Sequence, residues 1–206
     1  MSSATPLVES VPAIPCEQVA SHGEYRHLTT IPNIAIDLRY ATANNFAGRD
    51  LYTPLDCAWL HRDAAEALAS ASSWLAAQRT GTRVLVLDAL RPQRVQEALW
   101  AALQGTPLLG YLAPPERGSI HSFGMAVDVT LIDADGAEFD MGTGFDDFTP
   151  ASHANATGIS SVAQANRATL RSAMEAGGLS QYEGEWWHYD GPGSGTPRPH
   201  LNAPVY

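Results

Sequence analysis

Apolar and polar positions follow two different periods along the first half of this chain. Residues 34–40 alternate between apolar and polar side chains, which is typical of a half-buried strand. Residues 83–87 form a short apolar run that predicts a buried strand ending at Asp88. Residues 62–78 instead carry apolar side chains at helical spacing, with Gly81 just beyond the end. This half therefore mixes strands with a long helix.

The second half of the chain repeats the mixture. Pro92 suits a first helical turn and predicts a helix through about Leu103, followed by a proline- and glycine-containing loop over residues 105–118. The remaining expected elements are a strand over 125–132, a turn over 133–136, a helix over 163–176 closed by two glycines, and a last strand over 186–189. Mixed elements with short connections predict an α+β fold, with helices packed against a mainly antiparallel central sheet and the candidate functional site in a cleft.

No repeat or linker divides the sequence, so residues 1–206 are expected to form one domain. At 22.0 kDa the chain is long enough to bury a substantial core. Three prolines interrupt the apolar character of the N-terminus, and we expect an extended arm over residues 1–30. Residues 191–206 are rich in proline and glycine and are expected to form a C-terminal tail over the surface.

Charge and composition exclude several classes of partner. An apolar fraction of 45% is typical of a globular protein, and a net charge of −10 argues against nucleic acid and anionic membranes, which require clustered Lys and Arg. Residues 1–21 lack the basic start and apolar run of an export signal, so we expect a cytoplasmic protein, or a periplasmic one if such a signal precedes this sequence. Cys16 and Cys57 are too few for a disulfide framework and are expected to be reduced.

Two short segments carry the candidate chemistry. They are residues 119–128, Ser-Ile-His-Ser-Phe-Gly-Met-Ala-Val-Asp, and residues 185–188, Glu-Trp-Trp-His. Together they offer two imidazoles and a carboxylate as metal ligands: His121, His188 and Asp128. Three protein ligands with a fourth position left for water are typical of catalytic zinc. A carboxylate not needed as a ligand, such as Glu185, is the base that a zinc hydrolase requires. The sequence therefore predicts a metallopeptidase with one Zn²⁺ per chain.

Bringing these residues to one metal ion requires that the backbone depart from regular strand geometry in both segments. His121 at the entrance to a strand and Asp128 at its far end would be about 23 Å apart if the strand were regular. The segment must therefore bend, and Gly124 is the residue that would allow it. Glu185 and His188 would point to opposite faces of a strand, so a twist, a bulge or a loop must bring them to one ion.

A competing arrangement uses Ser119, His121 and Asp128 as a Ser-His-Asp triad. Nothing like a nucleophile elbow surrounds Ser119, and this interpretation leaves Glu185 and His188 without a role. The metal site accounts for more of the residues.

With these residues assembled, the chain resembles the zinc D-alanyl-D-alanine dipeptidases of the vancomycin-resistance type, relatives of the zinc D,D-carboxypeptidases. The family pattern Ser-x-His-x-x-Gly-x-Ala-x-Asp is matched over residues 119–128, and Glu-x-x-His over residues 185–188. Three further stretches fit the dipeptidase branch: residues 37–48, residues 88–92 with Leu90 in place of the usual tyrosine, and residues 141–146.

The resemblance implies a role for each residue of the metal site. It assigns zinc binding to His121, Asp128 and His188. It makes Glu185 the catalytic base, and Arg91 the group that steadies the oxyanion.

The resemblance also implies how substrate is held. Asp146, with help from Tyr40, is expected to bind the substrate ammonium group. Ser119 is carried over as a substrate-contacting hydroxyl. Asp88 belongs to the same substrate-binding set, as the residue that positions Arg91.

The function implied is hydrolysis of D-alanyl-D-alanine or similar D,D-dipeptides, with a small dipeptide as the only expected partner. Leu90 and a shortened segment 93–118 depart from the family pattern beside the cleft, which bears on selectivity. Two alternatives share the zinc core: a peptidoglycan D,D-carboxypeptidase or endopeptidase, and a non-catalytic zinc module of the Hedgehog signalling type. Glu185 and Arg91 favour an enzyme, because a binding module needs neither.

Overall fold

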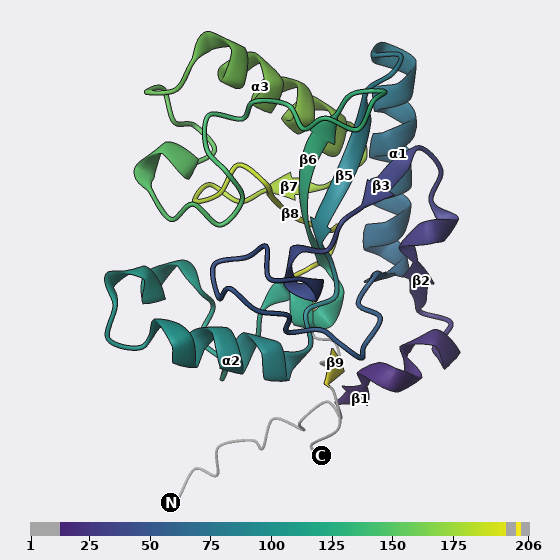
Figure 1. The fold of residues 1–206 in the computed structure, drawn as a ribbon. Helices are drawn as coiled ribbons and strands as arrows, with labels where there is room; N and C mark the ends of the chain where they lie inside the picture. The colour runs from purple at the N-terminus through teal and green to yellow at the C-terminus, as the bar shows by residue number, and fades with distance from the viewer. Residues whose placement is uncertain (1–12, 197–200, 203–206) are drawn as a thin grey trace, which may run out of the picture.

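A computed structural model describes residues 13–196 and 201–202, and its centre is a five-stranded sheet (Figure 1). The strand order is β3-β5-β6-β8-β7, and only the β3–β5 pair is parallel. The strands are β3 Ile34–Ile36, β5 Arg83–Asp88, β6 Ala126–Ile132, β7 Ser180–Gln181 and β8 His188–Asp190. The predicted α+β fold with a mainly antiparallel sheet is confirmed.

Three α-helices surround this sheet: α1 Arg62–Gln78, α2 Gln93–Leu103 and α3 Ser161–Ala176. Helices α1 and α3 pack against each other and share one core with strands β5 and β6, whereas α2 lies apart from them, beyond the end of β5 (Figure 1). At Gly177, just after α3, an added Cβ would lie 2.3 Å from the carbonyl oxygen of Ala67, so the chain leaving α3 touches the backbone of α1.

The two packed helices follow from their sequences. Helix α1 begins where the ring of His61 accepts a hydrogen bond from the backbone N–H of Asp63, at 3.2 Å. Helix α3 begins at Ser160, whose hydroxyl caps the N–H of Ala163. The buried residues of α1 recur at helical spacing and form one face: Ala64, Ala67, Leu68, Ala71 and Leu75.

Strand β6 is buried along its whole length because both of its faces are covered. Val127, Val129 and Leu131 point into the core shared with α1 and α3. The intervening residues face the other way, since side chains alternate along a strand. Asp128 therefore lies on the opposite face, where its register partners are Asp88 on β5 and His188 on β8.

Short elements complete the fold. Strand β1 Ile14–Pro15 pairs in parallel with β9 Leu201–Asn202, and β2 Tyr25–His27 pairs with β4 Trp59–His61. The 3₁₀ helices are η1 Cys16–Ser21, η2 Leu28–Thr30, η3 Arg39–Ala41, η4 Pro107–Tyr111, η5 Ile120–Phe123 and η6 Pro150–Ser152. Cys16 and Cys57 are buried free thiols.

The structure corrects several expected boundaries. The arm expected over residues 1–30 lies partly outside the described residues, and its described part instead contains two short strands and two 3₁₀ helices. The strand expected over 34–40 ends at Ile36, because the chain turns into η3. The last strand begins at His188 rather than at residue 186, since the two tryptophans before it lie in a loop. In the expected tail, Leu201 is fully buried against the N-terminal elements.

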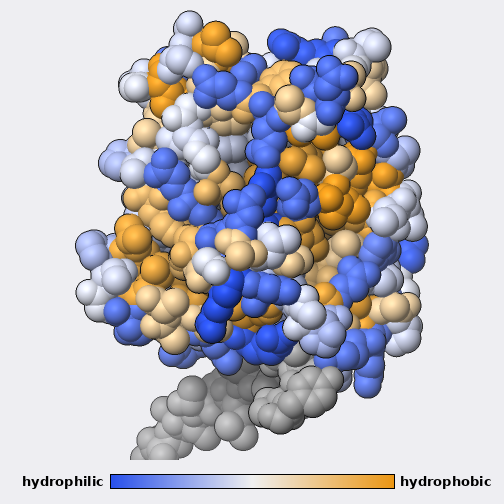
Figure 2. Space-filling view, viewed as in Figure 1, coloured by the Kyte–Doolittle hydropathy of each residue, from blue (hydrophilic) through white to orange (hydrophobic). Residues whose placement is uncertain are grey.

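Among the described residues, no helix combines the length and the hydropathy needed to cross a bilayer. Figure 2 shows hydrophilic and hydrophobic residues intermixed over the face turned to the viewer in Figure 1.

Candidate metal and catalytic site

A left-handed glycine brings His121 beside Asp128. The sequence placed His121 at the entrance to a strand, and the structure places it in η5, just before β6. Gly124 ends this turn with φ of 66° before β6 begins. The bend expected at Gly124 is therefore present. A Cβ at this position would lie 3.0 Å from the backbone nitrogen of His61, so packing as well as backbone conformation favours glycine here.

Three potential ligand atoms converge where η5, β6 and β8 meet. His121 Nε2 lies 3.1 Å from His188 Nδ1 and 3.3 Å from Asp128 Oδ1, and His188 Nδ1 lies 3.0 Å from the same oxygen. Zinc bonds of about 2.0–2.1 Å in tetrahedral geometry would place ligand atoms about 3.3 Å apart. These residues form the potential metal-binding group found among the described residues, and their spacing fits a single zinc ion.

The second nitrogen of each imidazole is also engaged. His121 Nδ1 lies 2.8 Å from the carbonyl oxygen of Ala89, and His188 Nε2 lies 3.1 Å from Asp190 Oδ1. Donation of an N–H to these acceptors leaves the opposite nitrogen with its lone pair free for a metal. Burial alone would raise the pKa of Asp128, but the two histidines beside it hold that pKa below its usual value.

Glu185 lies beside the ligand triangle, the group formed by His121, Asp128 and His188, but is not part of it. It lies in the loop before β8, and its Oε2 is 4.0 Å from His188 Nδ1. In a regular strand, Glu185 and His188 would point to opposite faces, and the loop lets both side chains reach the same site. Burial raises the pKa of Glu185 to about 7, although the nearby His188 opposes the shift. A carboxyl group with this pKa can both accept and release a proton near neutral pH.

Arg91 lines the site and is held in place by hydrogen bonds to Asp88. Its Nε and one Nη donate to Asp88 Oδ2 at 2.9 and 2.7 Å, and its other Nη donates to Gln96 at 3.2 Å. The other oxygen of Asp88 accepts from the Tyr52 hydroxyl and from the N–H of Ala89. Asp88 is fully buried and is not among the residues lining the cavity, so it reaches the site only through Arg91, the arginine that it was expected to position.

Asp146 and Tyr40 lie together, as expected, in the wall of the same cavity. The Tyr40 hydroxyl donates to Asp146 Oδ2 at 2.9 Å, and the Tyr40 ring lies under the guanidinium of Arg91, 5.0 Å from its carbon. Burial raises the pKa of Asp146 to about 8, despite the opposing charge of Arg91. A cation placed beside this carboxyl group would favour its ionised form.

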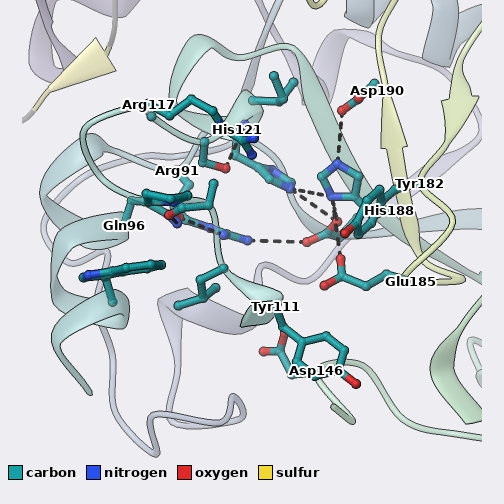
Figure 3. A pocket seen from close by; sticks show the side chains of 18 of the residues that line it. Arg91, Gln96, Tyr111, Arg117, His121, Asp146, Tyr182, Glu185, His188 and Asp190 are labelled. Atoms are coloured by element: carbon teal, nitrogen blue, oxygen red, sulfur yellow. Dashed lines mark hydrogen bonds and ion pairs between the residues drawn. The ribbon is translucent and has the colours of Figure 1, made fainter. Parts of the chain in front are cut away.

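One cavity of about 720 Å³ is bordered by the three potential ligands and by Glu185, Arg91, Tyr40, Asp146 and Asp190 (Figure 3). Ser119 lines it too, and its oxygen caps η5 by accepting from the N–H of His121. The lining residues that sequence reasoning missed include Asp190, Arg117 and Tyr182. A signal existed for Asp190, because a residue two positions beyond a ligand in a strand shares its face.

Comparisons with known proteins give a family match and several similar proteins. The peptidase M15 family model, described as D-ala-D-ala dipeptidase, matches residues 23–206. A D-alanyl-D-alanine dipeptidase of Escherichia coli (strain K12) is 40% identical over 161 residues, which cover 78% of this chain and 80% of that protein. The enzyme of the same name from Enterococcus faecium is 34% identical, covering 82% of this chain and 91% of that protein. A solved LdcB LD-carboxypeptidase structure matches 88% of this chain and 74% of its own, with 15% identity and a TM-score of 0.48.

Proposed function

The chain belongs to the D-ala-D-ala dipeptidase family of M15 metallopeptidases, and on that premise we propose that it hydrolyses D-alanyl-D-alanine and similar D,D-dipeptides with a zinc ion held by His121, Asp128 and His188. The observation that carries the proposal is that two further catalytic groups lie beside the three potential metal ligands. A proton-accepting carboxylate, Glu185, and a buried guanidinium, Arg91, border the same cavity.

Glu185 is the residue that moves the proton in this proposal. Zinc bound at the triangle would supply Lewis acidity, which polarises a carbonyl oxygen and lowers the pKa of water to about 7. Oε2 of Glu185 accepts the proton of the attacking water and then passes it to the departing amine. One carboxylate serves both halves of the reaction because burial raises its pKa to about 7, so that it can accept and release a proton near neutral pH.

Arg91 stabilises the charge that develops on the former carbonyl oxygen. Its guanidinium is fixed before the substrate arrives by hydrogen bonds to Asp88 and Gln96, so little reorganisation is needed during the reaction. The charge of Asp88 also keeps Arg91 positive in a buried setting.

Asp146 and Tyr40 hold the substrate ammonium group. Asp146 Oδ1 has no hydrogen bond among those described, whereas Oδ2 accepts from Tyr40, so one oxygen is left for the ammonium group. Binding of that cation offsets the burial that raises the pKa of Asp146. Ser119 also lines the cavity and contributes a hydroxyl group that contacts the substrate.

Metal analysis combined with a turnover assay on purified protein tests the proposal. We expect one zinc per chain and release of free D-alanine from D-alanyl-D-alanine. A zinc-loaded protein that releases no D-alanine from this dipeptide would contradict the assignment. Greater activity on a peptidoglycan pentapeptide would shift it to the carboxypeptidase alternative.

A further inference from the structure

A free dipeptide carries a charge at each end, and the proposed site accounts for only one of them. Asp146 provides a partner for the ammonium group, but the groups considered so far provide no countercharge for the terminal carboxylate. The need is marked in this protein, because a net charge of −10 repels an anionic group unless a local cation offsets it.

Two arginines line the cavity, and their surroundings differ. All three guanidinium nitrogens of Arg91 are engaged, with Asp88 and Gln96 as their partners. Arg117 is exposed, and its guanidinium has no hydrogen bond or ion pair with any residue of the described chain. Arg117 is therefore the cation that remains available to a ligand.

The backbone that carries Arg117 is held in place although the side chain is free. Two buried glutamines of α2 bind the loop before it: Gln93 Nε2 donates to the carbonyl oxygen of Pro115, and Gln96 Nε2 to that of Ala113, both at 2.8 Å. The N–H of Arg117 donates to the carbonyl oxygen of Pro114 at 3.0 Å. Gln96 also contacts Arg91, so the loop and the catalytic arginine share one anchor.

The position of Arg117 fits a substrate held between two charged ends. In Figure 3, Arg117 and Asp146 lie at opposite sides of the cavity, with His121 and His188 in the region between them. A dipeptide with its ammonium at Asp146 would lay its peptide bond near the metal ligands and direct its carboxylate towards Arg117.

We propose that Arg117 binds the terminal carboxylate of the substrate and thereby selects free dipeptides over substrates whose C-terminus is blocked. This inference rests on the proposed dipeptidase function. A guanidinium suits the role because its planar fork donates two parallel hydrogen bonds to a carboxylate.

Steady-state kinetics on D-alanyl-D-alanine and D-alanyl-D-alaninamide test this role. The amide keeps the ammonium group and the scissile bond but lacks the negative charge. For Arg117→Gln we expect kcat/KM on the free acid to fall by roughly 10- to 100-fold, mainly through KM, as expected for loss of a hydrogen-bonded charge. Activity on the amide should stay close to wild type. Arg117→Lys should retain part of the preference because it keeps the charge.

Arg79→Gln is the matched control, since it removes an exposed arginine at the end of α1, which does not line the cavity. It should leave both substrates unaffected. If Arg117→Gln lowers kcat/KM equally on the free acid and the amide, or on neither, Arg117 does not bind the substrate carboxylate.

Calorimetry separates this inference from the proposed function. The zinc-loaded Glu185→Gln protein should bind D-alanyl-D-alanine without consuming it, and adding Arg117→Gln should raise Kd by the same factor as KM. Equal Kd values in the two proteins overturn the role of Arg117, whatever the turnover. Absent turnover in the wild type contradicts the proposed function instead.

Discussion

Arg91 and Asp88 form a buried ion pair in which two guanidinium nitrogens donate to a single carboxylate oxygen, at 2.9 and 2.7 Å. Asp88 lies beside Asp128 in the strand register, and Arg91 also approaches Asp128 Oδ2 at 3.5 Å. The ladder of the sheet thus positions both a proposed metal ligand and the group that supports the proposed oxyanion donor. A register change between β5 and β6 just before Asp88 marks this end of the ladder.

Arg91 and Asp88 should act as one unit in catalysis. Arg91→Gln is expected to lower kcat by about 10²–10³-fold, the usual cost of losing one oxyanion donor. Asp88→Asn should lower kcat as well, because the guanidinium loses the charge that fixes it. In the double variant the two losses should not add, since Asp88 acts through Arg91. Steady-state kinetics of all four proteins measure this coupling, and additive losses would mean that Asp88 acts independently.

Glu185→Gln should separate metal binding from turnover. Glutamine keeps the shape of the side chain but cannot accept a proton, so kcat should fall by at least about 10²-fold. The metal content should remain at the wild-type level because the three ligand atoms come from other residues. Elemental analysis beside the kinetic assay checks both statements. Loss of zinc from this variant would show that Glu185 is a ligand.

Long periodic segments of this fold could be predicted from the sequence, whereas most of the shortest strands could not. Helix α1 matches the expected range 62–78 because it has a capping residue and an apolar face of several turns. Strands β1, β2, β4, β7 and β9 have two or three residues each, too few for a period to be detected.

In the candidate site, the chemistry of local segments could be predicted from the sequence, whereas contacts between distant segments could not. The chemistry of residues 119–128 and 185–188 predicted a ligand set and its spare carboxylate, whose atoms meet in the structure. The pairing of Asp128 with Asp88 and with His188 depends on strand register, which a single sequence does not contain. Arg117 was missed for a related reason, since its place at the cavity depends on long-range contacts between its loop and α2.

Asp190 should tune the affinity of the metal site. Its carboxylate lies 3.1 Å from His188 Nε2, on the side of the ring away from the ligand triangle. Asp190→Ala removes the acceptor that orients the ring, and loss of such a partner typically costs 10- to 100-fold in metal affinity. Competition with a chelator measures the zinc affinity. Asp133→Ala, at a turn distant from the site, is the control, and an equal effect of the two substitutions would remove the special role of Asp190.

Asp146→Asn should weaken substrate binding and also change how stability depends on pH. Burial raises the pKa of Asp146 from 3.8 to about 8. Between these values the unfolded chain has released a proton that the folded chain still holds, so a rise in pH favours unfolding across this window. The metal-free wild type should therefore lose stability from about pH 4 to 8 through this residue. Asparagine does not titrate, so the decline should be shallower in the variant.

Asparagine at position 146 should leave the local backbone and the hydrogen bond from Tyr40 unchanged, so the comparison isolates the effect of ionisation. Its φ is 60°, a left-handed conformation that asparagine adopts about as readily as aspartate, and the amide oxygen can still accept from the Tyr40 hydroxyl. Urea midpoints of both metal-free proteins at pH 5 and pH 8 measure the difference in slope. Asp147→Asn is the matched control, because Asp147 is next in the chain and does not line the cavity. KM for D-alanyl-D-alanine should rise only in Asp146→Asn, because the ammonium group loses its countercharge. Parallel slopes in the wild type and Asp146→Asn would mean that this carboxyl group ionises normally in the folded protein.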